Sequence, residues 1–478
     1  MSDLAPWSVK AMAAAMGAEC AGPLPEIISG ISIDSRTIAR GEAFLAIQGD
    51  ARDGHEFAAA ALQAGAGLAV VATDRRAAMP ADAPLLVVTD VLAGLTALAR
   101  AARARADAKI IAVTGSVGKT GTKEALRLAL GNSGATHASV ASYNNHWGVP
   151  LSLARMPPRT QYGIFEVGMN HAGEITPLTR LVRPHVAIVT TVEPVHLEYF
   201  GTIEAIADAK AEIFLGLEPG GAAIINRDNS QYERLARAVA AAGARAVSFG
   251  EHPQADARMI KLSLQPESST VHASILGAEV TYKLGAPGRH LVMNSLAVLA
   301  AAALAGADLA LASLALAALT PPSGRGQRIA LGLRGGGSAL VIDESYNANP
   351  ASMRAALALL GQATVGRRGR RIAVLGDMLE LGPAAGELHR GLAESILAND
   401  VDLVFCAGPL MKALWDALPS ERRGGYAESA AALETQVLTA VGDGDALMVK
   451  GSLGSRMAPI VKALARRYAS RTTQDASA

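Results

Sequence analysis

Short apolar runs bounded by turn residues alternate with helical patterns along most of the chain, which predicts an α/β fold. The apolar runs occupy residues 43–47, 68–71, 85–88, 110–113, 162–167, 186–192, 222–225, 339–342, 371–375, 403–406 and 446–449. Because near-continuous apolar runs are typical of parallel strands covered on both faces, we expect parallel sheets in the second and third parts of the chain. The stretch 259–284 alternates with polar residues instead, which predicts an antiparallel addition.

Helical patterns fill the intervals between these runs. They occupy residues 11–16, 95–107, 123–130 and 203–217. The most apolar stretch, 291–319, is interrupted by Asn294, Ser295, Gly306 and Asp308. A membrane span needs about 20 predominantly apolar residues, so we expect two Ala-rich core helices separated near Gly306, and no integral membrane association. The apolar stretch 11–16 is shorter than a secretory signal requires, which favours a cytoplasmic protein.

Two interruptions divide the pattern into three parts. A charged helical stretch ends near residue 106, and the segment 320–326 (TPPSGRG) breaks the alternation a second time. A chain of 478 residues also suggests about three domains at roughly 150 residues each. We predict a small mixed α/β domain at 1–106, a central P-loop domain with a parallel sheet at 107–321, and a Rossmann-like α/β domain at 322–478.

Charge and cysteine content exclude several classes of function. Lys and Arg number 44 against 43 Asp and Glu, a net charge of +1, so no overall positive field exists to hold nucleic acid. The two cysteines, Cys20 and Cys406, provide no disulfide framework and no CxxC metal site. Any anionic ligand must therefore be held by local groups.

The clearest local motif follows the run 110–113. Thr114-Gly-Ser-Val-Gly-Lys-Thr-Gly121 leads directly into a helical pattern, so a strand, a Gly-rich turn and a helix N-terminus follow one another. This arrangement presents backbone N–H groups to a polyphosphate. The residues expected to hold ATP are Gly115, Ser116, Val117, Gly118, Lys119 and Thr120, with the Thr120 hydroxyl on Mg²⁺. The general G-x-x-x-x-G-K-[ST] spacing would place glycine at Val113, so a tight turn beside an unrelated lysine is the alternative.

Three further polar residues follow apolar elements after this loop. Glu166 ends the run 162–167, where it could share Mg²⁺ with Thr120 or be a solvated strand end. His196 follows the run 186–192, where it could bind metal or close a loop. Lys210 stands between Ala209 and Ala211 on a helix, and taken alone it is expected to be a surface lysine.

With these residues the chain resembles the Mur ligases, ATP-dependent enzymes that add amino acids or peptides to a cell-wall precursor. The matching motifs are Asp34-Ser-Arg36, Asp53-Gly-His55, 114–120, Asn144-Asn-His-Trp-Gly-Val-Pro150, Glu166-Val-Gly-Met169, His196-Leu-Glu198, 209–214, Gly288–Asn294, 323–326, Asp343–Pro350, 374–382 and Lys450-Gly-Ser452. The P-loop spacing that departs from the general rule is the spacing that this family uses. The segment after Lys450 is longer than in many members, which leaves open whether Ser452, Ser455 or Arg456 takes the family's role.

The segments 343–350 and 374–382 resemble those of members that join D-alanyl-D-alanine to UDP-N-acetylmuramoyl-tripeptide. Members that add meso-diaminopimelate or lysine usually carry an Asp-Tyr-Ala-His-type segment at the first of these. The resemblance therefore implies a monomeric peptide ligase of peptidoglycan precursor synthesis. In this reaction ATP converts a carboxylate into an acyl phosphate, the dipeptide amine attacks it, and ADP and phosphate are released.

The resemblance also implies roles for individual residues. The catalytic residues would be Lys119, Glu166, His196 and Lys210. Two Mg²⁺ ions would be held by Thr120, Glu166, His196 and Lys210, the lysine as a carbamate formed with CO₂. Asn294, Arg325 and Asp343 would lie near ATP. UDP-substrate or dipeptide contacts would come from Ser35, Arg36, Asn144, Asn145, Tyr346 and Asn349, with domain 1–106 holding the uridine nucleotide and domain 322–478 closing over ATP and binding the dipeptide.

Purely structural roles stay open for several of these residues. Asn294 could be a helix N-cap or a satisfied buried amide, Arg325 a linker cation, and 34–36 a turn. Three other functions are alternatives to a ligase that adds D-alanyl-D-alanine: a sibling ligase that adds a single amino acid, a folylpolyglutamate-synthase-like enzyme, and a P-loop ATP-binding module without ligase activity. The segments 343–350 and 374–382 argue against the sibling ligase and the folylpolyglutamate-synthase-like enzyme. The presence of Lys119, Glu166, His196 and Lys210 argues against a module without ligase activity.

Overall fold

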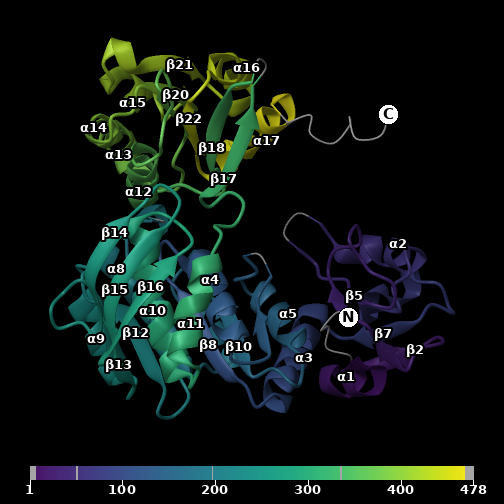
Figure 1. Ribbon diagram of the computed structural model, residues 1–478. Coiled ribbons are helices and arrows are strands. Elements are labelled where there is room, and N and C mark those ends of the chain that lie inside the picture. Colours follow the sequence, from purple (N-terminus) through teal and green to yellow (C-terminus); the bar gives the residue numbers. More distant parts are fainter. Residues whose placement is uncertain (1–6, 50–51, 141, 196, 334–335, 469–478) are drawn as a thin grey trace, which may run out of the picture.

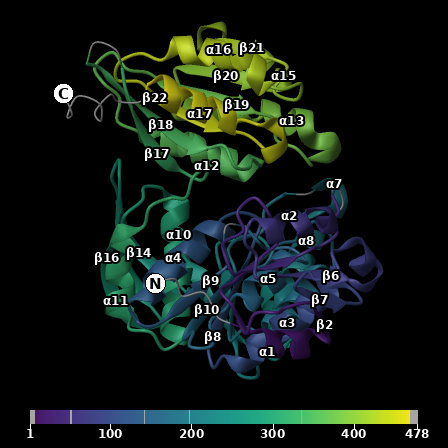
Figure 2. The ribbon, with the colours of Figure 1, turned by 90° about the vertical axis from the view of Figure 1, so that its right-hand side faces the viewer.

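The computed structural model describes residues 7–49, 52–140, 142–195, 197–333 and 336–468. Three α/β units follow one another along the chain (Figure 1). The C-terminal unit lies above the central unit, and the N-terminal unit lies beside the central one (Figures 1 and 2). The predicted fold class, three α/β units with a small mixed first one, is confirmed. The exact boundaries at 106/107 and 321/322 stay a prediction.

The first unit is built on a mixed sheet with the order β2–β7–β6–β5–β4. Its strands are β2 (Glu19–Ala21), β7 (Leu85–Val88), β6 (Leu68–Ala72), β5 (Ala43–Leu45) and β4 (Ile31–Ser32). Only β2 runs antiparallel to its neighbour in this sheet. A separate ribbon joins β1 (Trp7–Ser8) to β3 (Ile27–Ile28). The helices are α1 (Val9–Met16), α2 (Ala58–Gln63) and α3 (Val91–Arg105).

Polar contacts fix this unit to the central one. The Trp7 indole donates to the Ala154 carbonyl (2.9 Å), and Arg105 donates from Nη2 to the Met156 carbonyl (3.3 Å) while its guanidinium lies 3.5 Å above the Trp7 ring centroid. Arg155 donates from Nε to the Ile31 carbonyl at 2.8 Å. Each of these donors is aimed at a defined acceptor or ring, so the contacts set the orientation of the two units as well as their proximity.

The central sheet has the order β16–β15–β14–β13–β12–β11–β8–β10–β9. Its strands are β8 (Lys109–Thr114), β9 (Thr136–Ala138), β10 (Tyr162–Glu166), β11 (Val186–Val189), β12 (Ala222–Asn226), β13 (Arg245–Gly250), β14 (Ala257–Leu264), β15 (Ser269–Ile275) and β16 (Ala278–Leu284). Strands β8 to β13 pair in parallel, and β14, β15 and β16 pair antiparallel. The antiparallel addition predicted at 259–284 is therefore confirmed.

Helices cover both faces of this sheet, and the strand alternation decides which residues each face receives. Ile111 and Val113 of β8 pack in the cluster beneath α4 (Lys119–Gly131), α10 (Arg289–Leu304) and α11 (Leu309–Ala315). Ile110 and Ala112 pack on the opposite side. The helices there are α5 (Gly148–Ala154), α6 (Ile175–Val182), α8 (Ile203–Ala211) and α9 (Tyr232–Ala241).

Two helix predictions in this unit can now be judged. α10 and α11 are separated at Gly306 (φ +79°), as predicted. The helix predicted over 203–217 is wrong in its second half, because α8 ends at Ala211 and a 3-10 turn occupies Glu212–Gly216. Among the described residues, no helix combines the length and the apolar character that crossing a bilayer demands.

The third unit contains a sheet with the order β17–β18–β22–β19–β20–β21. Its strands are β17 (Gln327–Gly332), β18 (Ser338–Glu344), β22 (Ala446–Lys450), β19 (Arg371–Gly376), β20 (Leu403–Ala407) and β21 (Arg423–Ala427). All pairs are parallel except β17–β18. One face carries α12 (Pro350–Gly361), α13 (Ala385–Arg390), α14 (Leu392–Ala398) and α15 (Lys412–Ala417), and the other carries α16 (Ala430–Ala440) and α17 (Ala458–Arg467).

We predict that Asp445→Ala destabilises the third unit by about 3 kcal/mol. The buried Asp445 carboxylate accepts hydrogen bonds from the backbone N–H groups of Arg370 and Gly442 (2.8 Å each) and pairs with the Arg370 guanidinium at 2.7 Å. Its removal leaves two backbone donors without that acceptor. Urea denaturation should show the loss, whereas Asp416→Ala, at an exposed carboxylate paired with Lys412, should stay within about 0.5 kcal/mol of wild type. Equal effects of the two variants would contradict the argument.

Candidate functional site

A cavity of ≈1270 Å³ lies where the three units meet. Its central-unit wall includes residues 116–119, 142, 144–146 and 168–174, and its C-terminal wall includes 344, 346–349, 379–381, 450 and 452–454. Leu92 and Thr96 of α3 complete it from the N-terminal unit. The carboxyl ends of β8, β10, β18 and β22 all lie at this cavity, which is where α/β sheets bind ligands.

The Gly-rich loop begins where β8 ends. Gly115 has φ +148°, and a Cβ there would lie 1.9 Å from the Thr190 hydroxyl, so only glycine fits. Gly118, with φ +90°, caps the N-terminus of α4. Lys119 Nζ donates to the Gly115 carbonyl at 2.6 Å, which curls the loop around the ammonium. Burial lowers the pKa of Lys119, while Glu166 acts in the opposite direction. The loop has the form of a phosphate cradle.

Each carboxylate oxygen of Glu166 accepts a side-chain hydrogen bond beside this loop. Thr120 Oγ1 donates to Glu166 Oε2 at 2.9 Å, and Asn144 Nδ2 donates to Oε1 at 2.8 Å. Ser142 Oγ lies 3.4 Å from Thr120 Oγ1. The Glu166 side chain is buried, so the solvated-strand-end interpretation is wrong. A buried carboxylate touching the hydroxyl of a phosphate loop is the donor pair that suits Mg²⁺, and these two residues fit the ion.

Lys210 is buried, not exposed, which corrects the expectation drawn from its sequence neighbours alone. It shares the inward face of α8 with the buried Ile206 and Ala207, four and three residues earlier. Burial lowers the pKa of Lys210 well below its usual range, and the nearby Lys119 lowers it further. The amine is therefore pushed toward its neutral form.

The second metal ligand expected here, His196, lies outside the described residues. Among the residues that the structure describes, no cluster of three or more His, Cys, Asp or Glu side chains could hold a metal. Thr120 and Glu166 therefore supply a partial ligand set.

The three residues expected near ATP do different things. Arg325 reaches across the unit boundary: its Nη2 donates to Ser142 Oγ (3.3 Å), and its guanidinium lies 4.1 Å from the Tyr346 ring centroid. Asp343 accepts from the Gly324 N–H (2.9 Å) and so holds the linker. Asn294 lies within α10, so it is not an N-cap. Its side-chain amide lies close to Gly118, where an added Cβ would be 2.6 Å from Asn294 Nδ2. Of the three, only Arg325 lines the cavity.

The structure separates the remaining expected substrate residues. Asn144, Asn145, Tyr346 and Asn349 line the cavity. Asn145 Oδ1 accepts from the Gly148 N–H, and Asn349 caps α12 through the Ser352 N–H. Ser35 and Arg36 do not line it; they lie in an exposed turn where the Asp34 carboxylate binds Arg36, which holds the pKa of Asp34 at about 2.

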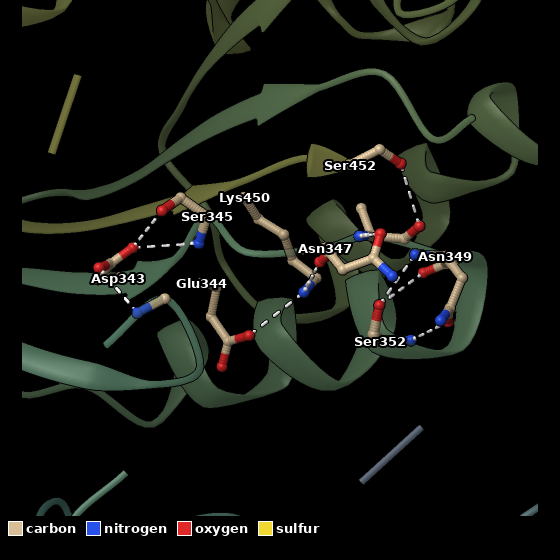
Figure 3. A network of polar contacts seen from close by, with 10 residues as sticks. Asp343, Glu344, Ser345, Asn347, Asn349, Ser352, Lys450 and Ser452 are labelled. Atoms are coloured by element: carbon tan, nitrogen blue, oxygen red, sulfur yellow. Dashed lines mark hydrogen bonds and ion pairs between the residues drawn. The ribbon is translucent and has the colours of Figure 1, made fainter. Parts of the chain in front are cut away.

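Sequence reasoning missed a partly buried ion pair on the C-terminal wall (Figure 3). Lys450 Nζ donates to Glu344 Oε2 at 3.2 Å and to the Asn347 carbonyl at 2.9 Å. The two residues end the neighbouring parallel strands β18 and β22, at paired register positions. The sequence did contain a signal for this pair: Glu344 and Lys450 each follow an apolar run that predicts a strand, at 339–342 and 446–449.

Ser452 joins three loops of this wall. Its hydroxyl accepts from the Leu379 N–H (2.9 Å) and donates to the Ala348 carbonyl (3.3 Å), and its own N–H donates to the Asp377 carbonyl at 3.0 Å. Ser455 only returns a bond to the Ser452 carbonyl (2.6 Å). Of the residues left open by the sequence, Ser452 is the one that shapes the cavity.

The fold and the loop define a P-loop protein with a further α/β unit on either side. Three family descriptions match the chain: the Mur ligase family catalytic domain at 27–105, the Mur ligase middle domain at 113–302, and the Mur ligase glutamate ligase domain at 324–453. The chain belongs to the Mur ligase family.

Named relatives extend the likeness over nearly the whole chain. UDP-N-acetylmuramoyl-tripeptide–D-alanyl-D-alanine ligase of Rickettsia prowazekii is 31% identical, covering 95% of this chain and 99% of the relative. The Escherichia coli protein of that name is 32% identical, covering 91% and 94%. A crystal structure of MurF from Acinetobacter baumannii has a TM-score of 0.83 at 29% identity, covering 97% and 100%. MurF ligase from Thermotoga maritima in complex with ADP has a TM-score of 0.74 at 25% identity, covering 91% and 98%.

We predict that Ser452→Ala exposes the backbone of the 377–382 loop. The Leu379 N–H loses its acceptor, and a hydrogen bond of about 1 kcal/mol corresponds to a roughly five- to tenfold change in opening. Hydrogen exchange of peptides covering this loop should be faster by that factor. Ser455→Ala removes a neighbouring hydroxyl that bonds elsewhere and should leave exchange there unchanged; a similar increase in both variants would contradict the assignment.

Proposed function

We propose that this chain is an ATP-dependent ligase that adds D-alanyl-D-alanine to UDP-N-acetylmuramoyl-tripeptide in peptidoglycan precursor synthesis. The observation that carries the proposal is the Thr120–Glu166 pair at the mouth of the phosphate loop, set in a cavity that both flanking units complete. The relatives that bear this enzyme's name match the chain nearly end to end at about 30% identity. A ligase that consumes ATP is suited to the cytoplasm, where ATP is present.

The reaction must bring two anions together, and the residues of the cavity suit that task. A terminal carboxylate oxygen of the tripeptide attacks the γ-phosphorus of ATP, the bond to the β-phosphate oxygen breaks, and ADP leaves. Lys119, the loop N–H groups and Arg325 would stabilise the negative charge on the transferring phosphoryl group. Thr120 and Glu166 would hold a Mg²⁺ ion, which supplies electrostatic shielding between the anions when bound.

The second step forms the amide bond. The neutral amine of the dipeptide attacks the acyl carbon to form a tetrahedral intermediate, the nitrogen loses a proton, and phosphate leaves with the oxygen that came from the tripeptide carboxylate. Acyl phosphates hydrolyse readily, so water must be kept out. A cavity walled by all three units provides that exclusion when the C-terminal unit lies against the central one.

We further propose that Lys210 carries a carbamate. Only the neutral form of an amine attacks CO₂, and burial beside Lys119 favours that form. The product is an anion, which removes the repulsion that an ammonium would exert on a metal. His196 and this carbamate would supply a second Mg²⁺ site, in addition to the one that Thr120 and Glu166 would hold.

The expected activity is release of phosphate that depends on all three substrates: ATP, UDP-tripeptide and D-alanyl-D-alanine. When the donor carboxylate carries oxygen-18, one label should appear in the phosphate, because the oxygen that attacks phosphorus leaves with it. Mass spectrometry should show the matching UDP-pentapeptide. Lys119→Ala should lower turnover by at least about a hundredfold through lost phosphoryl stabilisation.

Two results would overturn this function. Stimulation by single amino acids alone would identify a sibling ligase, and hydrolysis of ATP that is indifferent to any acceptor would identify an ATP-binding module without ligase activity. Unlabelled phosphate accompanying genuine product would overturn the acyl-phosphate route and leave the substrates assigned.

We predict that Lys210→Ala lowers turnover severely and that short carboxylic acids such as acetate or propionate restore part of it. The freed space would admit a carboxylate that replaces the carbamate group. Lys109→Ala, an exposed lysine of the same unit, is the matched control and should respond to neither the substitution nor the acid. Failure of every acid to rescue Lys210→Ala, together with the absence of a ¹³C carbamate signal in wild type supplied with labelled bicarbonate, would contradict the modification.

A further inference from the structure

Lys123 is a fully buried lysine for which the reaction described above has no use. It lies in the second turn of α4, four residues after Lys119, and its side chain is 0% exposed. It does not line the cavity. Burying an ammonium carries a large desolvation penalty, and an apolar residue of the same shape would avoid it. A charge kept in such a place calls for an explanation.

The Lys123 ammonium is directed at the end of β9. Its Nζ donates to the Ser139 carbonyl at 2.7 Å and pairs with Glu124 Oε1 at 2.9 Å. Ser139 follows β9 directly, at the point where its chain leaves the sheet. α4 packs against both β9 and β10, and these elements lie close together in Figure 2. Lys123 therefore ties the phosphate-loop helix to the start of the loop that follows β9.

That loop supplies the contacts around Glu166. The Ser139 hydroxyl accepts from the Glu166 N–H at 3.1 Å. Three residues further along, Ser142 lies beside Thr120 and accepts from Arg325. Asn144 then binds the Glu166 carboxylate with its side chain and the Gly168 N–H with its carbonyl (2.8 Å each). One segment thus holds both the backbone and the side chain of Glu166, and Lys123 holds that segment at its first residue.

We propose that Lys123 is a positioning residue that sets the geometry of the Thr120–Glu166 metal pair by holding the Ser139 carbonyl. The inference rests on the proposed function, because it takes Thr120 and Glu166 as Mg²⁺ ligands. Lys123 touches neither substrate nor metal; it acts through Ser139. Lysine suits the position because its long side chain reaches from the helix to the strand end and brings three donors to a site with more than one acceptor.

The test compares metal binding with nucleotide binding in Lys123→Met, which keeps the length and removes the charge. Mn²⁺ binding in the presence of ADP, followed by electron paramagnetic resonance, should weaken about tenfold, the lower end of the effect seen when groups that orient metal ligands are removed. ADP binding in EDTA should stay within twofold of wild type, because the phosphate loop is intact. Lys109→Met is the matched control on an exposed lysine, and Glu124→Gln, which keeps the bond to Ser139, should bind Mn²⁺·ADP like wild type.

A second variant keeps the inference falsifiable if Lys123→Met does not fold. Ser139→Ala leaves the lysine and its carbonyl acceptor in place and removes the hydroxyl that receives the Glu166 N–H, so it should show the same selective loss of Mn²⁺ binding. Unchanged Mn²⁺·ADP affinity in either variant, or an equal loss of metal-free ADP binding, overturns the positioning role. A wild-type chain that makes no UDP-pentapeptide instead overturns the proposed function, so the two failures are distinguishable.

Discussion

The 2.9 Å hydrogen bond between Thr120 and Glu166 depends on the pairing of two parallel strands. β8 and β10 pair so that Glu166 stands opposite Val113, one residue before β8 ends at Thr114. A parallel pair in this register delivers the carboxylate to the same height as the phosphate loop. A shift by one residue would turn Glu166 to the other face of the sheet. The whole site therefore depends on the side-chain alternation of two short buried strands.

The same register explains the unusual spacing of the phosphate loop. Val113 occupies the position where the general motif has glycine, and it is fully buried in the core beneath α4. β8 continues through Thr114, so the turn starts later, at Gly115, where the Thr190 hydroxyl leaves no room for a Cβ. Moving the glycine by two residues extends the strand and leaves Gly118 and Lys119 at the start of α4. Local geometry thus accounts for a departure that a pattern match alone would count against the site.

Much of the fold could be predicted because buried parallel strands have nearly continuous apolar sequences. The run 85–88 coincides with β7, and the alternation over 259–284 gave the antiparallel strands. Strands without such a run escaped prediction. β21 (RGGYA) contains two glycines, which disfavour strands, and β9 (THA) is three partly exposed residues. Both are strands only because a neighbouring strand offers a ladder of hydrogen bonds, which is a tertiary effect that no local pattern carries.

The site residues also differ in whether a local sequence pattern could predict them. Lys119 and Thr120 could be predicted because one continuous segment builds the phosphate loop, whereas the Glu344–Lys450 pair unites residues 106 positions apart. Lys123 and Lys210 carry the argument further, since both are buried lysines on helices of one unit. Lys123 donates to a carbonyl and pairs with a carboxylate, whereas burial lowers the pKa of Lys210 and the nearby Lys119 lowers it further. Both helices bury their lysine, and what differs is the group that each lysine faces: a carbonyl and a carboxylate at Lys123, a second lysine at Lys210.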